Sequence, residues 1–183
     1  MLIENFAPSA RQWIEAACRL AVKDGHRHVT PYHLLYSALE KELAQVTPML
    51  RDSACKLDTL QTRLKECLTK VDKAASGATS TPVNRALETV LLQAEEESGA
   101  TGNASIQCHA VLKSLTSDED IRDVLKQAET NLTKLDELVL VSKLQAGQGA
   151  DTEFLQQYTR NLTDLALAGK LDPVIGRDVE IRQ

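Results

Sequence analysis

An internal repeat limits the folds open to this chain more than its composition does. Residue types recur at a constant offset of 74 in three pairs: Pro8/Pro82, Arg11/Arg85 and Gly25/Gly99. The offset then becomes 76 in three further pairs: His33/His109, Leu35/Val111 and Leu39/Leu115. The two extra residues fall in the small-polar stretch 100–104, where an insertion costs little. The pattern predicts two similar units, one after the other.

Apolar spacing within each unit predicts helices. A first stripe at spacings of three and four, ended by Gly25, consists of Ala10, Trp13, Ile14, Ala17, Cys18 and Ala21. Thr-Pro pairs at 30–31, 47–48 and 81–82 predict three helix starts, and Ser117 is predicted to cap another helix. Further stripes run through Leu57–Val71 and Leu132–Val139. We therefore predict an all-α fold of two tandem four-helix motifs.

Breaks in this periodicity predict the domain boundaries. The helical domain is expected at 1–144, with repeat one at 1–75 and repeat two at 80–144. Residues 145–153 carry two glycines and no apolar period, which predicts a linker. Residues 154–183 are expected to begin a further module.

Composition excludes several classes of partner. The net charge is −5 and no block of Lys and Arg stands out, so we expect no nucleic-acid partner. No stretch of about 18 apolar residues and no leader pattern is found, so we expect a cytoplasmic protein without a membrane partner. Four widely spaced cysteines are expected to be reduced: Cys18, Cys55, Cys67 and Cys108.

No catalytic motif accompanies the repeat. The chain lacks the G-x-x-x-x-G-K-[ST] loop that holds phosphates, so we expect no ATP hydrolysis and no catalytic residues. A zinc site could be assembled from Cys18, His26, His28 and His33, but a capping or packing role for His33 and its recurrence His109 explains the pattern better. Acidic runs at 95–97 and 118–120 are expected to be helix ends rather than paired catalytic carboxylates.

Binding is the remaining function. Each half has an apolar stripe that it cannot bury alone, so pairing about a pseudo-twofold axis should close one core and leave a groove at the seam. We expect this groove to accept apolar segments of unfolded proteins weakly, with a Kd of the order of 10 μM or poorer. Its predicted lining is Leu34, Leu35, Leu91, Leu92, Val111 and Leu112.

Two sequence phrases carry a family resemblance. The segments Val29–Leu35 (VTPYHLL) and Ile106–Leu112 (IQCHAVL) resemble the two copies of the Clp N-terminal repeat. Residues 158–163 (YTRNLT), 169–178 (GKLDPVIGRD) and 180–182 (EIR) resemble the stretch that leads into the first ATPase module of Clp AAA+ unfoldases and disaggregases. The segment Val46–Leu50 is most similar to the ClpB type. One departure is Ala7 after Phe6, where the family often has Thr.

The resemblance implies a recognition domain that is not itself an enzyme. Its implied partners are unfolded or aggregated proteins and adaptor proteins, and it implies no cofactor here, with ATP and Mg needed only by a longer, hexameric parent. The stretch Val174, Ile175, Gly176 and Arg177 would form the adenine side of an incomplete nucleotide site. The isolated domain is expected to be a monomer.

Two alternatives within the family and one outside it stay open. The domain of a ClpV-type secretion motor would bind one helix of a sheath protein, and that of a protease-associated Clp unfoldase would bind a folded adaptor. A small zinc hydrolase would require stoichiometric metal, which elemental analysis tests.

Overall fold

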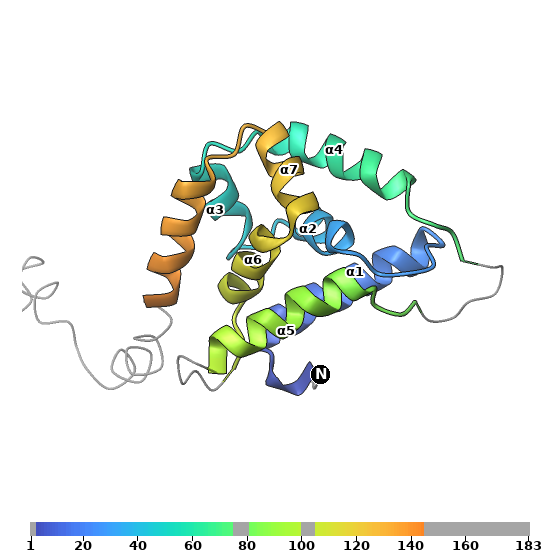
Figure 1. The fold of residues 1–183 in the computed structure, drawn as a ribbon, viewed down its shortest axis with the longest axis horizontal. Helices are drawn as coiled ribbons and strands as arrows, with labels where there is room; N and C mark the ends of the chain where they lie inside the picture. Colours follow the sequence, from blue (N-terminus) through green and yellow to red (C-terminus); the bar gives the residue numbers. More distant parts are fainter. Residues whose placement is uncertain (1–2, 75–80, 100–104, 145–183) are drawn as a thin grey trace, which may run out of the picture. The chain divides into compact units, whose positions relative to one another are not determined.

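The computed structural model describes residues 3–74, 81–99 and 105–144. Within these ranges the chain forms helices joined by short connections, with three isolated β-bridges and no strand (Figure 1). The all-α prediction is confirmed. Residues Met1–Leu144 form one compact unit. The linker and module start predicted at 145–183 lie outside the described residues.

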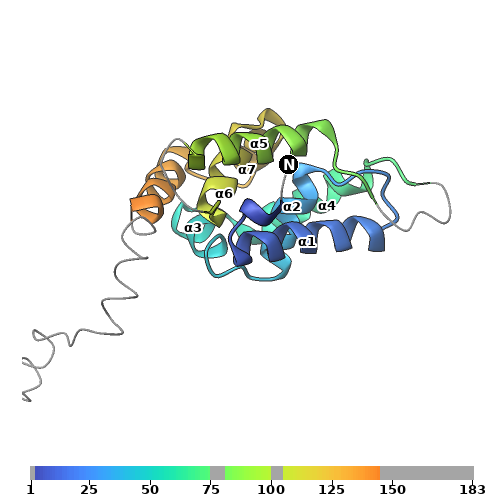
Figure 2. The same ribbon diagram turned by 90° about the horizontal axis from the view of Figure 1, so that it is seen from below.

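Within the described ranges, each repeat supplies four α-helices. Repeat one contains a 3-10 turn η1 (Ile3–Asn5), α1 (Pro8–Lys23), α2 (Pro31–Glu40), α3 (Thr47–Asp52) and α4 (Leu57–Thr69). Repeat two contains α5 (Arg85–Gly99), α6 (Cys108–Ser117), α7 (Glu119–Gln127) and a helix over 132–144, drawn in orange without a label in Figure 1. In the second view, α1 and α5 lie on opposite sides of the unit (Figure 2).

Both repeats contribute to one hydrophobic core. Within repeat one, α2 packs on α1 and α4, and within repeat two, α6 packs on α5 and α7. Contacts of α1 with α6, α2 with α5 and α4 with α7 join the repeats. Trp13 is fully buried and its indole Nε1 donates a hydrogen bond to the carbonyl oxygen of Leu34 at 2.7 Å. The indole therefore fixes α1 on α2 through a bond as well as through packing.

Two short backbone pairings connect repeat one with repeat two. Phe6 forms a parallel bridge with Ile106, and Val29 forms a parallel bridge with Val83. Each hydrogen bond of the first pairing has an equivalent in the second. The bond from Ala7 N to Ile106 O (2.9 Å) is equivalent to the bond from Asn84 N to Val29 O (2.9 Å). The bond from Ile106 N to Asn5 O (2.8 Å) is equivalent to the bond from Val29 N to Pro82 O (2.8 Å). Both bridges give a repeat offset of 77 (83−6 and 106−29). The offsets of 74 and 76 inferred from residue identities are therefore wrong.

The pairing also corrects helix starts predicted from local signals. Thr81-Pro82 does not open a helix, because residues 82–84 are used in the pairing with Val29, and α5 begins at Arg85. Ser117 ends α6, and it is Asp118 that caps α7 by accepting the amide of Ile121 at 3.1 Å. Thr47 is the first residue of α3 rather than its cap.

Candidate protein-binding surfaces

The structure places most of the predicted groove residues in the core. Leu34, Leu35, Leu91, Val111 and Leu112 each have 0% exposure, whereas Leu92 is 43% exposed. Five of the six cannot touch a client in this conformation, because they are buried in the hydrophobic core. This corrects the predicted lining. Three depressions lined by described residues each lie within one repeat.

His33 has the structural role predicted for it. It is the third residue of α2, and its Nδ1 accepts the backbone amide of Thr30 at 3.1 Å. Since Nδ1 is an acceptor, Nε2 carries the proton and donates to Nδ1 of His26 at 2.8 Å. Burial first, and the neighbouring His26 second, lower the pKa of His33 to about 4. The imidazole is therefore neutral near pH 7 and acts as a capping group.

His109 is not the structural equivalent of His33. The offset of 77 pairs His33 with Ala110 (110−33), and His109 is the second residue of α6 instead of the third. It is buried, and burial together with Lys143 lowers the pKa of His109. The prediction of a shared symmetric role for the two histidines is wrong, because only His33 faces the cap.

The structure gives no support to the zinc alternative in the part of the chain it describes. No group of three His, Cys, Asp or Glu side chains there lies close enough to hold a metal ion. All four cysteines are free thiols, and burial raises the pKa of each. A raised pKa keeps a thiol protonated and poorly nucleophilic. The predicted reduced state of the cysteines fits this arrangement.

An exposed apolar surface lies on the helix over 132–144. Leu140, Val141 and Leu144 are 56%, 49% and 63% exposed, and we call these three residues the apolar face. The other large exposed apolar residues described are separate: Val22, Val83 and Leu92. Neighbouring exposed apolar residues of this kind are a common feature of protein-binding surfaces.

Comparison with α4 shows that the fold does not demand this face. The helix over 132–144 starts 75 residues after α4 (132−57), and the buried Leu60 and Leu64 of α4 correspond to the buried Leu135 and Val139. At outward positions α4 carries Lys65, Glu66 and Thr69, where the later helix carries the three residues of the apolar face. Polar residues therefore suffice at these positions for the same packing.

The helix that carries the apolar face lies beside the short helix α3. Figures 1 and 2 both show the orange helix beside α3. Ser142 Oγ is 4.0 Å from Sδ of Met49, a half-buried residue of α3 packed against the core. The sequence held a signal for this face, because Leu138–Val141 is a run of four apolar residues, wider than one buried stripe.

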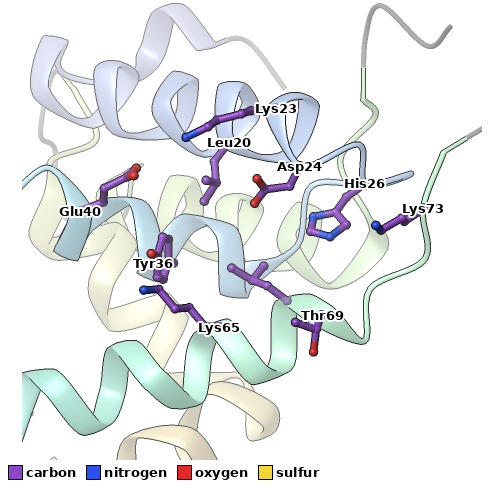
Figure 3. A pocket seen from close by; sticks show the side chains of 10 residues that line it. Leu20, Lys23, Asp24, His26, Tyr36, Glu40, Lys65, Thr69 and Lys73 are labelled. Atoms are coloured by element: carbon purple, nitrogen blue, oxygen red, sulfur yellow. The ribbon is translucent and has the colours of Figure 1, made fainter. Parts of the chain in front are cut away.

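A second surface is a polar depression in repeat one. It lies between α1, α2 and α4 and has a volume of about 520 Å³ (Figure 3). Charged side chains surround it, and only small parts of Leu20, Tyr36 and Leu68 reach it. Its chemistry therefore differs from that of the apolar face.

No helix in the described ranges is long and apolar enough to cross a lipid bilayer.

Comparisons with known proteins agree with this architecture. The Clp repeat (R) N-terminal domain family matches residues 5–128. The chaperone protein ClpB of Chlamydia pneumoniae is 31% identical over 189 residues, which cover 99% of this chain and 22% of that protein. The chain thus spans about a fifth of that relative's length.

Solved structures share the fold at lower identity. The Hsp104 N-terminal domain from Candida albicans superposes with a TM-score of 0.67 at 15% identity, covering 74% of this chain and 89% of that one. A ClpV N-domain in complex with a VipB peptide gives a TM-score of 0.55 at 18% identity, over 65% and 72% of the two chains.

Proposed function

The chain belongs to the Clp repeat N-terminal domain family, and on that premise we propose that it recognises exposed apolar segments of unfolded or aggregated proteins for an ATP-dependent disaggregase. The observation that carries this proposal is the apolar face. Clients of this kind differ from native proteins in the apolar side chains that they expose. A surface that buries such side chains selects them without reading a sequence.

The area available sets the affinity. Each side chain of the apolar face is about half exposed, so complete burial of all three contributes about 3 kcal/mol in total. Ordering a flexible client segment cancels part of this gain, and a free energy of about −4 kcal/mol corresponds to a Kd of only about 1 mM. Binding at one apolar face is therefore weak and quickly reversed. Weak binding suits a domain that must release its client to a motor.

The proposal also includes the residues predicted to form the adenine side of a nucleotide site. Val174, Ile175, Gly176 and Arg177 lie outside the described residues, so their role stays a prediction. We propose that ATP and Mg act in a longer parent, in which this domain supplies recognition. The relatives that the chain matches extend well beyond it, which leaves room for such a motor.

A single partner helix is the alternative ligand. The solved ClpV N-domain complex holds a VipB peptide, and an amphipathic helix presents one apolar stripe that could lie on the apolar face. The two ligands differ in specificity: an unfolded chain binds through any apolar segment, whereas a helix binds through one pattern of anchors.

An NMR titration of the whole chain with a permanently unfolded test protein examines the proposal. We expect fast-exchange shifts centred on Leu140, Val141 and Leu144, because these three residues form the apolar face. The triple variant L140S/V141S/L144S should weaken binding by about tenfold, since it removes most of the apolar area. V22S is the matched control, because Val22 is exposed to a similar extent on a different helix.

Two other outcomes of the titration would point to a different binding site or a different ligand. If L92S rather than the triple variant abolishes the shifts, the client binds near the repeat seam as the sequence predicted. If neither variant matters and one amphipathic helix binds tightly while the unfolded protein does not, the helix-binding alternative replaces the proposal.

A further inference from the structure

The depression in repeat one has the size of a peptide-binding pocket. Its volume of about 520 Å³ lies within the roughly 300–1,000 Å³ typical of ligand sites. Helices α1, α2 and α4 form its walls, and Figure 3 shows the side chains around it. It accepts a few side chains but not a folded domain. We call it the lysine pocket, for Lys23, Lys65 and Lys73 on its rim.

The floor of the lysine pocket is apolar but small. Leu20, Tyr36 and Leu68 reach it, and each is less than a tenth exposed. The hydrophobic effect therefore supplies little binding energy there beyond one anchoring side chain. A ligand needs a second source of attraction, which the rim provides.

The rim carries three lysines against two carboxylates, Asp24 and Glu40, so its positive charge is only partly balanced. None of its three lysines forms an ion pair within the described part of the chain, although the chain as a whole has a net charge of −5. The ammonium of Lys65 lies 6.0 Å from the centroid of the Tyr36 ring. In Figure 3, Lys65 and Lys73 lie on the α4 side of the pocket, with Thr69 between them.

The opposite side of the pocket carries Lys23 at the end of α1 and two carboxylates, those of Asp24 and Glu40, at the ends of α1 and α2. The two carboxylates disfavour acidic groups on that side. The charges of the pocket are therefore polarised, and a ligand carboxylate is attracted toward α4.

Backbone pairing holds the far end of the pocket rigid. His26 bridges to Lys73, and Ala74 donates its amide to the Gly25 carbonyl at 2.8 Å. The His26 ring is fixed by its 2.8 Å contact with His33. A pocket formed before binding loses less conformational entropy when a ligand enters.

Repeat two shows that the fold does not require a lysine at the position of Lys65. At the offset of 75 between α4 and the helix over 132–144, Lys65 corresponds to Leu140 (140−65). The same helix position thus carries a charge in one repeat and an exposed leucine in the other.

We propose that the lysine pocket binds a short acidic segment of a partner protein. One apolar side chain of the segment enters toward Leu20 and Leu68, and flanking carboxylates meet Lys65 and Lys73. The occupant follows from charge complementarity, because an unpaired lysine rim around a small apolar floor matches an apolar residue between acidic ones. This pocket is distinct from the apolar face and independent of the function proposed for it.

Fluorescence anisotropy with labelled synthetic peptides tests the proposal on the whole chain. The probe is a short peptide with one leucine flanked by glutamates, and the control probe has glutamines in their place. We expect the glutamate peptide to bind about tenfold more tightly, and raising the salt from about 50 to about 300 mM to weaken it, because salt screens exposed charges.

Variants locate the binding. K65E and K73E should each weaken the glutamate peptide about fivefold or more. K65Q, which removes the charge without reversing it, should act in the same direction. K134E makes the same charge change at an exposed residue outside the pocket and should have an effect below about twofold. Thermal unfolding of each variant checks that the fold is intact.

Two results would overturn the proposal. One is equal binding of the glutamate and glutamine peptides, and the other is an equal effect of K134E and K65E. The triple variant of the apolar face should leave the acidic peptide bound, and K65E should leave binding of the unfolded protein unchanged. If one correctly folded variant loses binding of both ligands, the two ligands share a single site, and the assignment of two separate sites is wrong.

Discussion

The two repeats share a backbone arrangement but differ in how they use it. In repeat one, α1 begins after Ala7, whose methyl group forms no capping hydrogen bond. In repeat two the corresponding Asn84 (84−7 = 77) accepts the amide of Leu87 at 2.9 Å. The surfaces differ more strongly, since repeat one carries the lysine pocket and repeat two the apolar face.

This difference teaches which positions the fold constrains. Buried positions of α1 and α5 agree at the offset of 77 in five pairs: Ala10/Leu87, Trp13/Val90, Ile14/Leu91, Ala17/Ala94 and Ala21/Ser98. Side-chain sizes vary within these pairs, but burial does not. Outward positions are free of this constraint, so each repeat can present its own chemistry to partners.

The largest expected effect tests whether the two halves of the core contribute equally. W13A should destabilise the domain by about 3–5 kcal/mol, because it empties a fully buried site and removes the hydrogen bond to Leu34. V90A, at the corresponding position of repeat two, should cost only about 2 kcal/mol. Urea unfolding followed by circular dichroism measures both, and equal costs would show that Val90 carries as much of the core as Trp13.

An intermediate effect concerns the histidine cap, which the described part of repeat two lacks. The pKa of His33 is about 4 in the folded chain and about 6.5 when unfolded, so the unfolded state binds more protons between these values. Its stabilising contribution is complete above about pH 6.5 and is lost as the pH falls toward 4.

Between pH 7 and pH 5 this loss should amount to about 1–2 kcal/mol after allowance for solvent screening. Urea midpoints of the parent and of H33Q at both pH values give the difference. H33Q should be less stable at pH 7 but should lose less between the two values. An identical pH dependence would mean that His33 stays neutral or that its proton is tolerated.

The smallest effect tests the capping difference directly. N84A should cost about 1 kcal/mol, because the amide of Leu87 loses its acceptor at the start of α5. A7S introduces a hydroxyl at the equivalent position and should gain up to about 0.5 kcal/mol. Thermal melting is adequate for this pair. A destabilised A7S would show that the buried site of Ala7 leaves no room for the extra oxygen.

Local sequence signals predicted the helices well and their register poorly. The apolar stripe at Ala10–Ala21 and the left-handed Gly25 (φ +69°) determine α1 and its end, because both act over a few residues. Matching identical residues gave offsets of 74 and 76, since proline and glycine recur near helix ends for local reasons. Matching the apolar stripes gives 77, the value that the bridges establish.

The sequence by itself determined the all-α class, the doubled plan and the family resemblance, because helical periodicity and repetition are local properties of the chain. Only the tertiary structure decided which leucines are available to a partner. Leu34 and Leu140 are equally apolar, yet Leu34 is fully buried in the core and Leu140 is exposed to solvent. The exposure of a residue depends on which distant segments of the chain pack against it. A local sequence pattern does not contain this information.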